Sequence, residues 1–282
     1  MCTNARIRSR RRTAAAIATA GVLALSVLNA PAAQARDTGI VLSGLVINNG
    51  KPIVVGNSRV VEPPTRFNIA LPAGYSTDNP SRYEAHPFLY RGNITHAADS
   101  GDNYLGPGGY ICYELDAHRA RCEGAMYIDP PARDTIADNN DDATKWKTGV
   151  ALRLFPAGDG PVIAQEYETR PGSVSLRRAA KVTVDATPEP VAKGRKITVK
   201  GKLTRVNWTT GRTGPYAGST VSLQFRAKNA TTFKTLKKVT TNSAGALRTT
   251  VTASTDGFFR WVFLGNTTTG TATSGQDYID VR

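Results

Sequence analysis

The stretch that decides the fold runs Lys196-Ile197-Thr198-Val199-Lys200-Gly201-Lys202-Leu203. Apolar and polar residues mostly alternate in it, which is typical of a β-strand with one face on a core and the other in water. Turn residues such as Asp256-Gly257 separate it from similar runs. Those further runs are residues 182–184, 221–226, 233–240, 246–253, 258–264 and 278–281. Seven short strands in about 100 residues predict an immunoglobulin-like β-sandwich over residues 181–282.

The aromatic residues Phe259, Trp261 and Phe263 recur at period two and are expected to form the centre of that core. The preceding part of the chain is less regular but also strand-rich, and we predict a sandwich over residues 36–180, with long acidic loops at 96–109 and 129–144. Its candidate strands are residues 40–47, 52–56, 67–71, 87–90, 110–115, 122–128, 146–155, 162–168 and 173–176. The predicted fold class is therefore all-β, with two immunoglobulin-like β-sandwich domains in tandem.

Residues 1–35 have the pattern of a cleaved signal peptide. Five arginines between positions 6 and 12 precede an apolar stretch from Ala14 to Leu28, and Ala33-Gln34-Ala35 fits the small-x-small cleavage pattern. An N-terminal amphipathic or membrane-anchoring helix is the alternative. No later run is apolar over the roughly 18 residues that a transmembrane helix needs. We therefore predict a secreted protein, extracellular or associated with the cell wall.

Two cysteines, Cys112 and Cys122, remain after the predicted cleavage removes Cys2. Both lie in strand-like runs separated by a polar turn, so an antiparallel hairpin would place them nearly opposite each other. An oxidising compartment then favours a disulfide between them. A pair of buried free thiols is the alternative.

The second half resembles a known group of proteins. The resemblance rests on Asp185–Gly194, Ile197–Leu203, Val221–Arg226 and Asp277–Arg282. Together they resemble the C-terminal immunoglobulin-like domain of secreted proteins from Streptomyces and related actinobacteria. Over residues 36–180 the resemblance rests on Gly50–Gly56, Leu105-Gly106-Pro107 and the cysteine hairpin. It implies the tandem fold and the exported compartment, and some members carry a calcium-binding label. It transfers no catalytic residue.

Charge differs sharply between the two halves. Residues 36–180 contain 15 Lys and Arg against 17 Asp and Glu, whereas residues 181–282 contain 16 against 5. This asymmetry indicates an anionic partner for the second half or attraction between the halves, and a solvated basic face is the alternative. Lysines alternating on a strand also protect sheet edges. The candidate residues for binding an anionic polymer are Lys196, Lys200, Lys202, Lys234, Lys237 and Lys238.

The acidic loops are candidates for a calcium site because Ca²⁺ takes six to eight oxygen ligands. The pattern lacks the glutamate that closes an EF-hand loop, and Asp and Asn also cluster in ordinary turns. The candidate ligands are Asp99, Asp102, Asn103, Asp138, Asp141 and Asp142.

No catalytic motif is present. The mature chain has three histidines, His86, His96 and His118, outside any HExxH pattern, and it has no GxSxG, SxxK or Walker sequence. We predict a non-enzymatic binding or scaffolding protein of the cell envelope with no cofactor, and calcium at the acidic loops is the alternative that the sequence leaves open. The expected partner is an anionic wall polymer or an extracellular protein, and not nucleic acid. The alternatives are a calcium- or carbohydrate-binding module and a secreted hydrolase.

Overall fold

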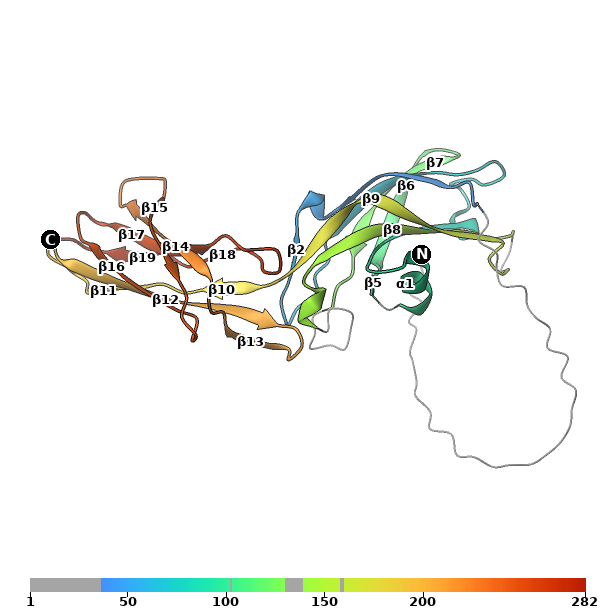
Figure 1. Ribbon diagram of the computed structural model, residues 1–282. Coiled ribbons are helices and arrows are strands. Elements are labelled where there is room, and N and C mark those ends of the chain that lie inside the picture. Colours follow the sequence, from blue (N-terminus) through green and yellow to red (C-terminus); the bar gives the residue numbers. More distant parts are fainter. Residues whose placement is uncertain (1–36, 102, 130–138, 158–159) are drawn as a thin grey trace, which may run out of the picture. The chain divides into compact units, whose positions relative to one another are not determined.

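The structure, a computed structural model, describes residues 37–101, 103–129, 139–157 and 160–282. Its regular structure is almost all β-strand, arranged in four sheets, which confirms the predicted all-β fold (Figure 1). The predicted signal peptide lies outside the described residues, as do Asp102 and Asp138. Within the described ranges, no helix is both long and apolar enough to cross a membrane.

Residues 41–178 form the first sandwich. One sheet has the antiparallel order β1-β3-β7-β6, and the other has the order β2-β9-β8-β4-β5, in which β2 and β9 are parallel. The strands are β1 (Val41–Ile47), β2 (Ile53–Val55), β3 (Pro64–Ala70), β4 (Tyr83–Tyr90), β5 (Tyr104–Leu105), β6 (Pro107–Asp116), β7 (Arg119–Met126), β8 (Lys145–Leu154) and β9 (Ala164–Arg178). The helical segments are α1 (Ile94–Ser100) and three 3-10 turns, η1 (Asn48–Gly50), η2 (Pro80–Arg82) and η4 (Asn140–Asp142).

The first core lies between these two sheets. In β3, Thr65, Phe67 and Ile69 are buried while Pro64, Arg66 and Asn68 between and before them are exposed, which is the burial pattern of a strand with one face on a core. Phe67 and Ile69 pack in one cluster with Val150 and Leu152 of β8. The period-two pattern in the sequence therefore specifies which face of β3 is inside.

The predicted disulfide is present. Cys112 of β6 lies directly opposite Cys122 of β7, and the two are bonded with their Cα atoms 4.0 Å apart. Cys122 is fully buried in the first core. The hairpin therefore places the two cysteines as the sequence indicated.

The expected loop at residues 96–109 is wrong at both ends, because residues 94–100 form helix α1, and strands β5 and β6 begin at Tyr104 and Pro107. Asn93 caps the helix by accepting the His96 backbone N–H at 3.0 Å. Gly101 ends it with a φ of 76°, a left-handed conformation that glycine adopts without strain. A helix of two turns is too short to show a clear 3.6-residue period, so its signal in the sequence is weak.

Residues 180–279 form the second sandwich. In one sheet β12 is central, with β10, β11, β13 and β16 all pairing with it, and the other has the order β15-β14-β17-β18, with β19 also pairing with β17. The strands are β10 (Ala180–Val182), β11 (Asp185–Thr187), β12 (Lys196–Asn207), β13 (Arg212–Pro215), β14 (Thr220–Ala227), β15 (Lys234–Thr240), β16 (Ala246–Thr252), β17 (Gly257–Phe263), β18 (Ala272–Thr273) and β19 (Asp277–Ile279). Six predicted runs coincide with strands to within a few residues, whereas residues 182–184 fall at the break between β10 and β11.

The second core is centred on Trp261, as the aromatic spacing predicted. Phe259, Trp261 and Phe263 are all buried, and the Trp261 indole N–H donates to the Lys200 carbonyl at 2.9 Å. Gly201 is required beside this ring, because a Cβ there would lie 2.8 Å from the indole and 2.5 Å from the Thr183 carbonyl oxygen. The glycine that interrupts the alternation of 196–203 thus makes room for the tryptophan.

Strand β12 extends past the predicted end at Leu203 to Asn207, and Val206 and Trp208, the residue directly after the strand, pack on residues of the first half. Trp208 is buried in a cluster with Ile53 and Trp146, and its indole N–H donates to the Val55 carbonyl at 3.3 Å. The Asn140 side-chain oxygen accepts the Trp208 backbone N–H at 3.0 Å. Residues 206–208 therefore contribute to a core that the sequence pattern assigns to residues 36–180.

Candidate functional site

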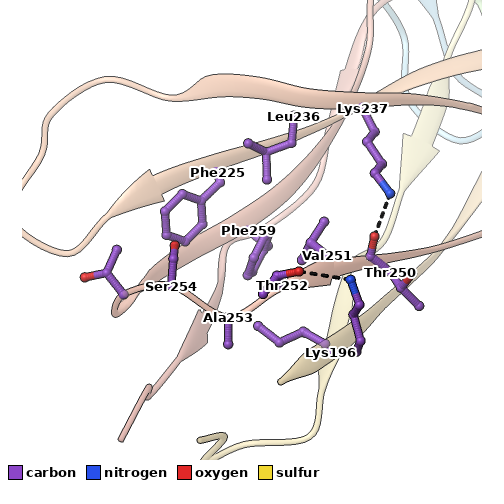
Figure 2. Close-up of a pocket in the computed structure, with 12 residues that line it drawn as sticks. Lys196, Phe225, Leu236, Lys237, Thr250, Val251, Thr252, Ala253, Ser254 and Phe259 are labelled. Atoms are coloured by element: carbon purple, nitrogen blue, oxygen red, sulfur yellow. Dashed lines mark hydrogen bonds between the residues drawn. The ribbon is translucent and has the colours of Figure 1, made fainter. Parts of the chain in front are cut away.

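A groove opens in the second sandwich between β15 and β16, which are edge strands of the two different sheets (Figure 2). Its volume is about 350 Å³. The residues that line the groove include Lys196, Phe225, Lys237, Thr250, Thr252 and Phe259. The groove combines two of the predicted site residues, Lys196 and Lys237, with an apolar floor.

The floor of the groove is aromatic. Phe225 of β14 lies opposite Phe259 of β17 in the sheet register, and their ring centroids are 4.9 Å apart at an interplanar angle of 45°. Such tilted pairs are favoured by the quadrupoles of the rings. Val251 of β16 adds an aliphatic wall from the facing sheet. The floor therefore presents an apolar surface at the open side of the sandwich.

Two of the predicted lysines form the rim of this groove. The Lys237 ammonium donates to the Thr250 backbone carbonyl at 2.7 Å, and the Lys196 ammonium donates to the Thr252 hydroxyl at 3.0 Å (Figure 2). These lysines come from β15 and β12, which belong to different sheets. The two lysine clusters that the sequence placed far apart therefore meet at β16.

Lys237 is directed toward the sandwich interior, because it lies opposite the fully buried Leu223 in the β14–β15 ladder. From there it reaches the edge strand β16 and satisfies a carbonyl of that strand. Inward-pointing charges of this kind keep sheet edges from pairing with other chains. Edge protection therefore describes Lys237 well.

Edge protection does not describe the lysines of β12, because β12 is the central strand of its sheet. Lys200 lies opposite Arg248 of β16, a basic residue that the sequence analysis did not single out although it alternates outward in a predicted strand. We call the four exposed residues of this surface the basic face: Lys196, Lys200, Lys202 and Arg248. Like charges on one face repel, so an anion bound there lowers the electrostatic free energy. Asp185, 4.0 Å from Lys200, is the acidic residue paired with this face.

The remaining predicted lysines, Lys234 and Lys238, are exposed on β15. Lys238 lies opposite Ser222, on the side of the ladder away from Leu223. Lys234 and Lys238 therefore add positive charge on the sheet of β15, while the basic face adds it on the sheet of β12 and β16.

The acidic loops of the first sandwich meet at an arginine. The guanidinium of Arg91 donates to the side-chain oxygens of Asn103 and Asp142, and to the Asp141 carbonyl at 3.2 Å. It also lies over the Trp146 ring at 4.9 Å from the centroid. Asp142 is 2% exposed, so this carboxylate is a buried charge whose partner is a protein cation.

Asp99 lies in a separate network. Its carboxylate accepts the Tyr167 hydroxyl at 2.7 Å, so it does not join Asn103 and Asp142 at Arg91. Among the described residues there is no group of three or more His, Cys, Asp or Glu side chains arranged to hold a metal. With Asp102 and Asp138 outside the described ranges, calcium binding stays a prediction.

A second ion-pair network connects β4 and β8. Arg153 donates to Glu84 at 2.8 Å, and Glu84 also contacts His86 at 3.0 Å. Burial alone would raise the Glu84 pKa, but the hydrogen bonds and positive charges of His86 and Arg153 outweigh it and lower that pKa to about 2. Glu84 is therefore ionised at neutral pH and serves the fold.

The three histidines lie on different elements, His86 on β4, His96 on α1 and His118 in the β6–β7 turn. The His118 ring contacts the Tyr75 carbonyl at 2.8 Å. His86 contacts Glu84 at 3.0 Å and lies edge-on to the Tyr110 ring, with the ring centroids 5.7 Å apart. The geometry thus offers a binding surface in the second sandwich and structural networks in the first.

Comparisons with known proteins return similarity in fold only. No family model matches the sequence, and no curated protein matches it. The first three domains of the outer capsid protein Hoc from bacteriophage RB49 are 12% identical, with 86% of this chain and 70% of that chain covered and a TM-score of 0.29. Fibronectin(III)-like modules of Clostridium thermocellum CbhA are 8% identical, covering 84% and 93% at a TM-score of 0.28. A superoxide reductase from Ignicoccus hospitalis is 15% identical, covering 36% and 80% at a TM-score of 0.28.

The class of protein therefore follows from the sheets themselves, whose strand orders define an all-β chain of tandem immunoglobulin-like sandwiches. Such sandwiches host many unrelated functions, so a function has to be argued from the surfaces described above.

Proposed function

We propose that this protein is a secreted, non-enzymatic binding protein of the cell envelope whose second sandwich attaches to an anionic polymer of the cell wall. The observation that carries the proposal is the meeting of the two lysine clusters at β16, where Lys196 and Lys237 line one groove. A polyanion crossing this region would contact the basic face and the β15 lysines together. The excess of 16 basic over 5 acidic residues in 181–282 adds long-range attraction.

The proposed compartment is supported by the disulfide between Cys112 and Cys122, because disulfides persist in oxidising environments outside the cytoplasm. The signal-peptide pattern of residues 1–35 points the same way. An extracellular protein with an acidic surface is the second kind of partner that this charge would attract.

The test is binding of the full chain to isolated Gram-positive cell walls across a salt series, with calcium or with chelator. We expect binding that falls steeply with salt, because ions screen exposed charges over roughly 10 Å at 0.1 M. Binding should survive chelator. Absence of binding at low salt would overturn the proposal, and dependence on calcium would favour the alternative of a calcium-dependent module.

The matched variants locate the surface. Removing three charges of the basic face, with Lys196→Gln, Lys200→Gln and Lys202→Gln together, should reduce low-salt binding by about tenfold and flatten its salt dependence. The control removes three exposed charges from the first sandwich, with Lys51→Gln, Arg59→Gln and Lys145→Gln together. Equal losses in the two triple variants would show that net charge, and not the basic face, controls binding.

A further inference from the structure

Among the described residues, strand β6 is the edge of its sheet, because it stands last in the order β1-β3-β7-β6 and pairs with β7. Near its end the Thr77 hydroxyl donates to the Asp116 carbonyl at 2.9 Å, which closes the edge there. The open edge therefore comprises Ile111–Leu115. β6 has ten residues, which is long for an edge strand, because natural sheets usually keep edge strands short or place charged residues on them.

Three apolar side chains project from this edge strand. Ile111, Tyr113 and Leu115 are 65%, 52% and 62% exposed, and their period-two spacing puts them on one face. The strand contains no lysine or arginine, and its proline, Pro107, is its first residue. Over residues 109–115 the edge thus has no lysine, arginine or proline to block pairing, and its charged side chain is Glu114, on the same face as Cys112.

The apolar strip is confined to the edge. On the neighbouring strand β7, Arg121 lies opposite Tyr113 and Glu123 opposite Ile111, and these two residues form an ion pair at 2.9 Å. The exposed apolar side chains therefore belong to the edge strand and not to a broad apolar patch over the sheet.

The backbone groups at the free edge can be assigned from the ladder. Cα atoms 4.0 Å apart at Cys112 and Cys122 indicate a non-hydrogen-bonded pair, which is the closer of the two antiparallel pair types. The N–H and C=O of Cys112 therefore point away from β7. By alternation, those of Glu114 also point away from β7. A second strand can hydrogen-bond to the backbone groups of Cys112 and Glu114.

The sequence of this edge is complementary to itself when two copies run antiparallel about a two-fold axis at Tyr113. Ile111 then lies opposite the partner's Leu115, and Tyr113 opposite the partner's Tyr113. Cys112 pairs with the partner's Glu114, which matches the backbone groups that face the edge. No two like charges oppose each other in this register, and all three exposed apolar side chains face one another.

We propose that β6 pairs with β6 of a second copy of this chain, joining the two four-stranded sheets into one continuous sheet. The pairing is isologous, so each copy uses the same surface and the assembly closes as a dimer. Three cross-strand apolar pairs and a short ladder make a small interface, for which a dissociation constant on the order of 10 µM is expected.

The test measures molar mass by sedimentation equilibrium of the purified full chain from about 1 µM to about 100 µM, a range that brackets the expected dissociation constant. We expect a reversible rise from one chain mass to two. A single chain mass throughout would overturn the proposal.

Two double variants test the register. Ile111→Lys with Leu115→Lys places like charges opposite each other across the two-fold axis and should weaken dimerisation at least tenfold. Ile111→Lys with Leu115→Glu removes the same apolar surface but places opposite charges across the axis, so it should keep more of the dimer. Equal loss in both variants would overturn this register.

The control substitution is Val41→Lys, at another exposed apolar residue on β1, the opposite edge of the same sheet. It should leave dimerisation unchanged, and loss of the dimer in this variant would place the interface elsewhere. Unchanged circular dichroism and an intact disulfide in every variant show that the changes act on association and not on folding.

Discussion

Strands β6 and β15 are both edges of four- or five-stranded sheets, yet their chemistry is opposite. β6 presents Ile111, Tyr113 and Leu115 to solvent and contains no basic residue. β15 carries three lysines, and the Lys237 ammonium donates a hydrogen bond to the carbonyl of Thr250 on the edge strand of the facing sheet. One architecture can therefore leave a sheet edge open for pairing in one sandwich and close it with charge in the other.

The two sandwiches also differ in what stabilises them. The first contains a disulfide, the buried Arg91–Asp142 pair and the Glu84–Arg153 pair, whereas the second is built around an aromatic core at Trp261. The first should therefore respond to reductant and acid, and the second mainly to the loss of apolar volume.

Trp261→Ala should have the largest effect. The indole is fully buried and its N–H donates to the Lys200 carbonyl, so truncation leaves a cavity and an unpaired carbonyl. We expect a loss of about 4 kcal/mol in unfolding free energy, measured by urea denaturation. Phe258→Ala, at a partly exposed position of the same strand, is the control and should lower the unfolding free energy much less. Similar losses in the two variants would contradict an aromatic core centred on Trp261.

Arg91→Met should cost about 3 kcal/mol, because it leaves the Asp142 carboxylate buried without its cation. Urea denaturation of the variant measures the loss. The exposed Arg59 provides the control through Arg59→Met, which should change stability little. A loss that calcium restores in Arg91→Met alone would indicate that a metal can replace the guanidinium between Asn103 and Asp142.

Replacing both cysteines, with Cys112→Ala and Cys122→Ala, should cost about 2.5 kcal/mol, since the bond closes a short loop with a separation of 10 residues. Reductant should produce a comparable loss in the unmodified protein and none in the double variant. Stability that does not change with reductant would show that the hairpin holds without its covalent link.

Glu84→Gln should cost about 2 kcal/mol near neutral pH, and the cost should disappear in acid. The folded pKa of Glu84 lies at about 2, below its ordinary value of 4.5. Its contribution is therefore complete above pH 4.5 and is lost as the pH falls from there toward 2. Urea denaturation at neutral and acid pH measures the change, with the exposed Glu62→Gln as control. A cost that is the same at both pH values would show that the ion pair is not its source.

Lys237→Met should have the smallest effect on stability, about 1 kcal/mol or less, because it removes one partly exposed hydrogen bond. It should nevertheless promote association through β15, whose edge loses its inward charge. The control is Lys238→Met, which removes the same charge and leaves the Thr250 contact in place. Light scattering at high concentration compares them, and equal association would argue against a special role for Lys237.

Much of the fold could be predicted from the sequence because a period of two residues records which face of a strand is buried. Residues 196–203, the Trp261 strand and the cysteine hairpin were assigned correctly on that basis. Helix α1 was missed because two turns carry too little periodicity. The packing of Trp208, directly after the end of β12, was also missed, because this residue contacts residues more than 50 positions away in the sequence.

For the candidate site, the sequence was enough to show that the lysines of β12 share one face, that residues 181–282 are strongly basic, and that Cys112 and Cys122 face each other. Three further features follow from the strand order alone: β12 is central, β6 and β15 are edges, and Lys196 and Lys237 meet at β16. The physical reason is that alternation is a local property of the chain, whereas strand order depends on which distant strands pair.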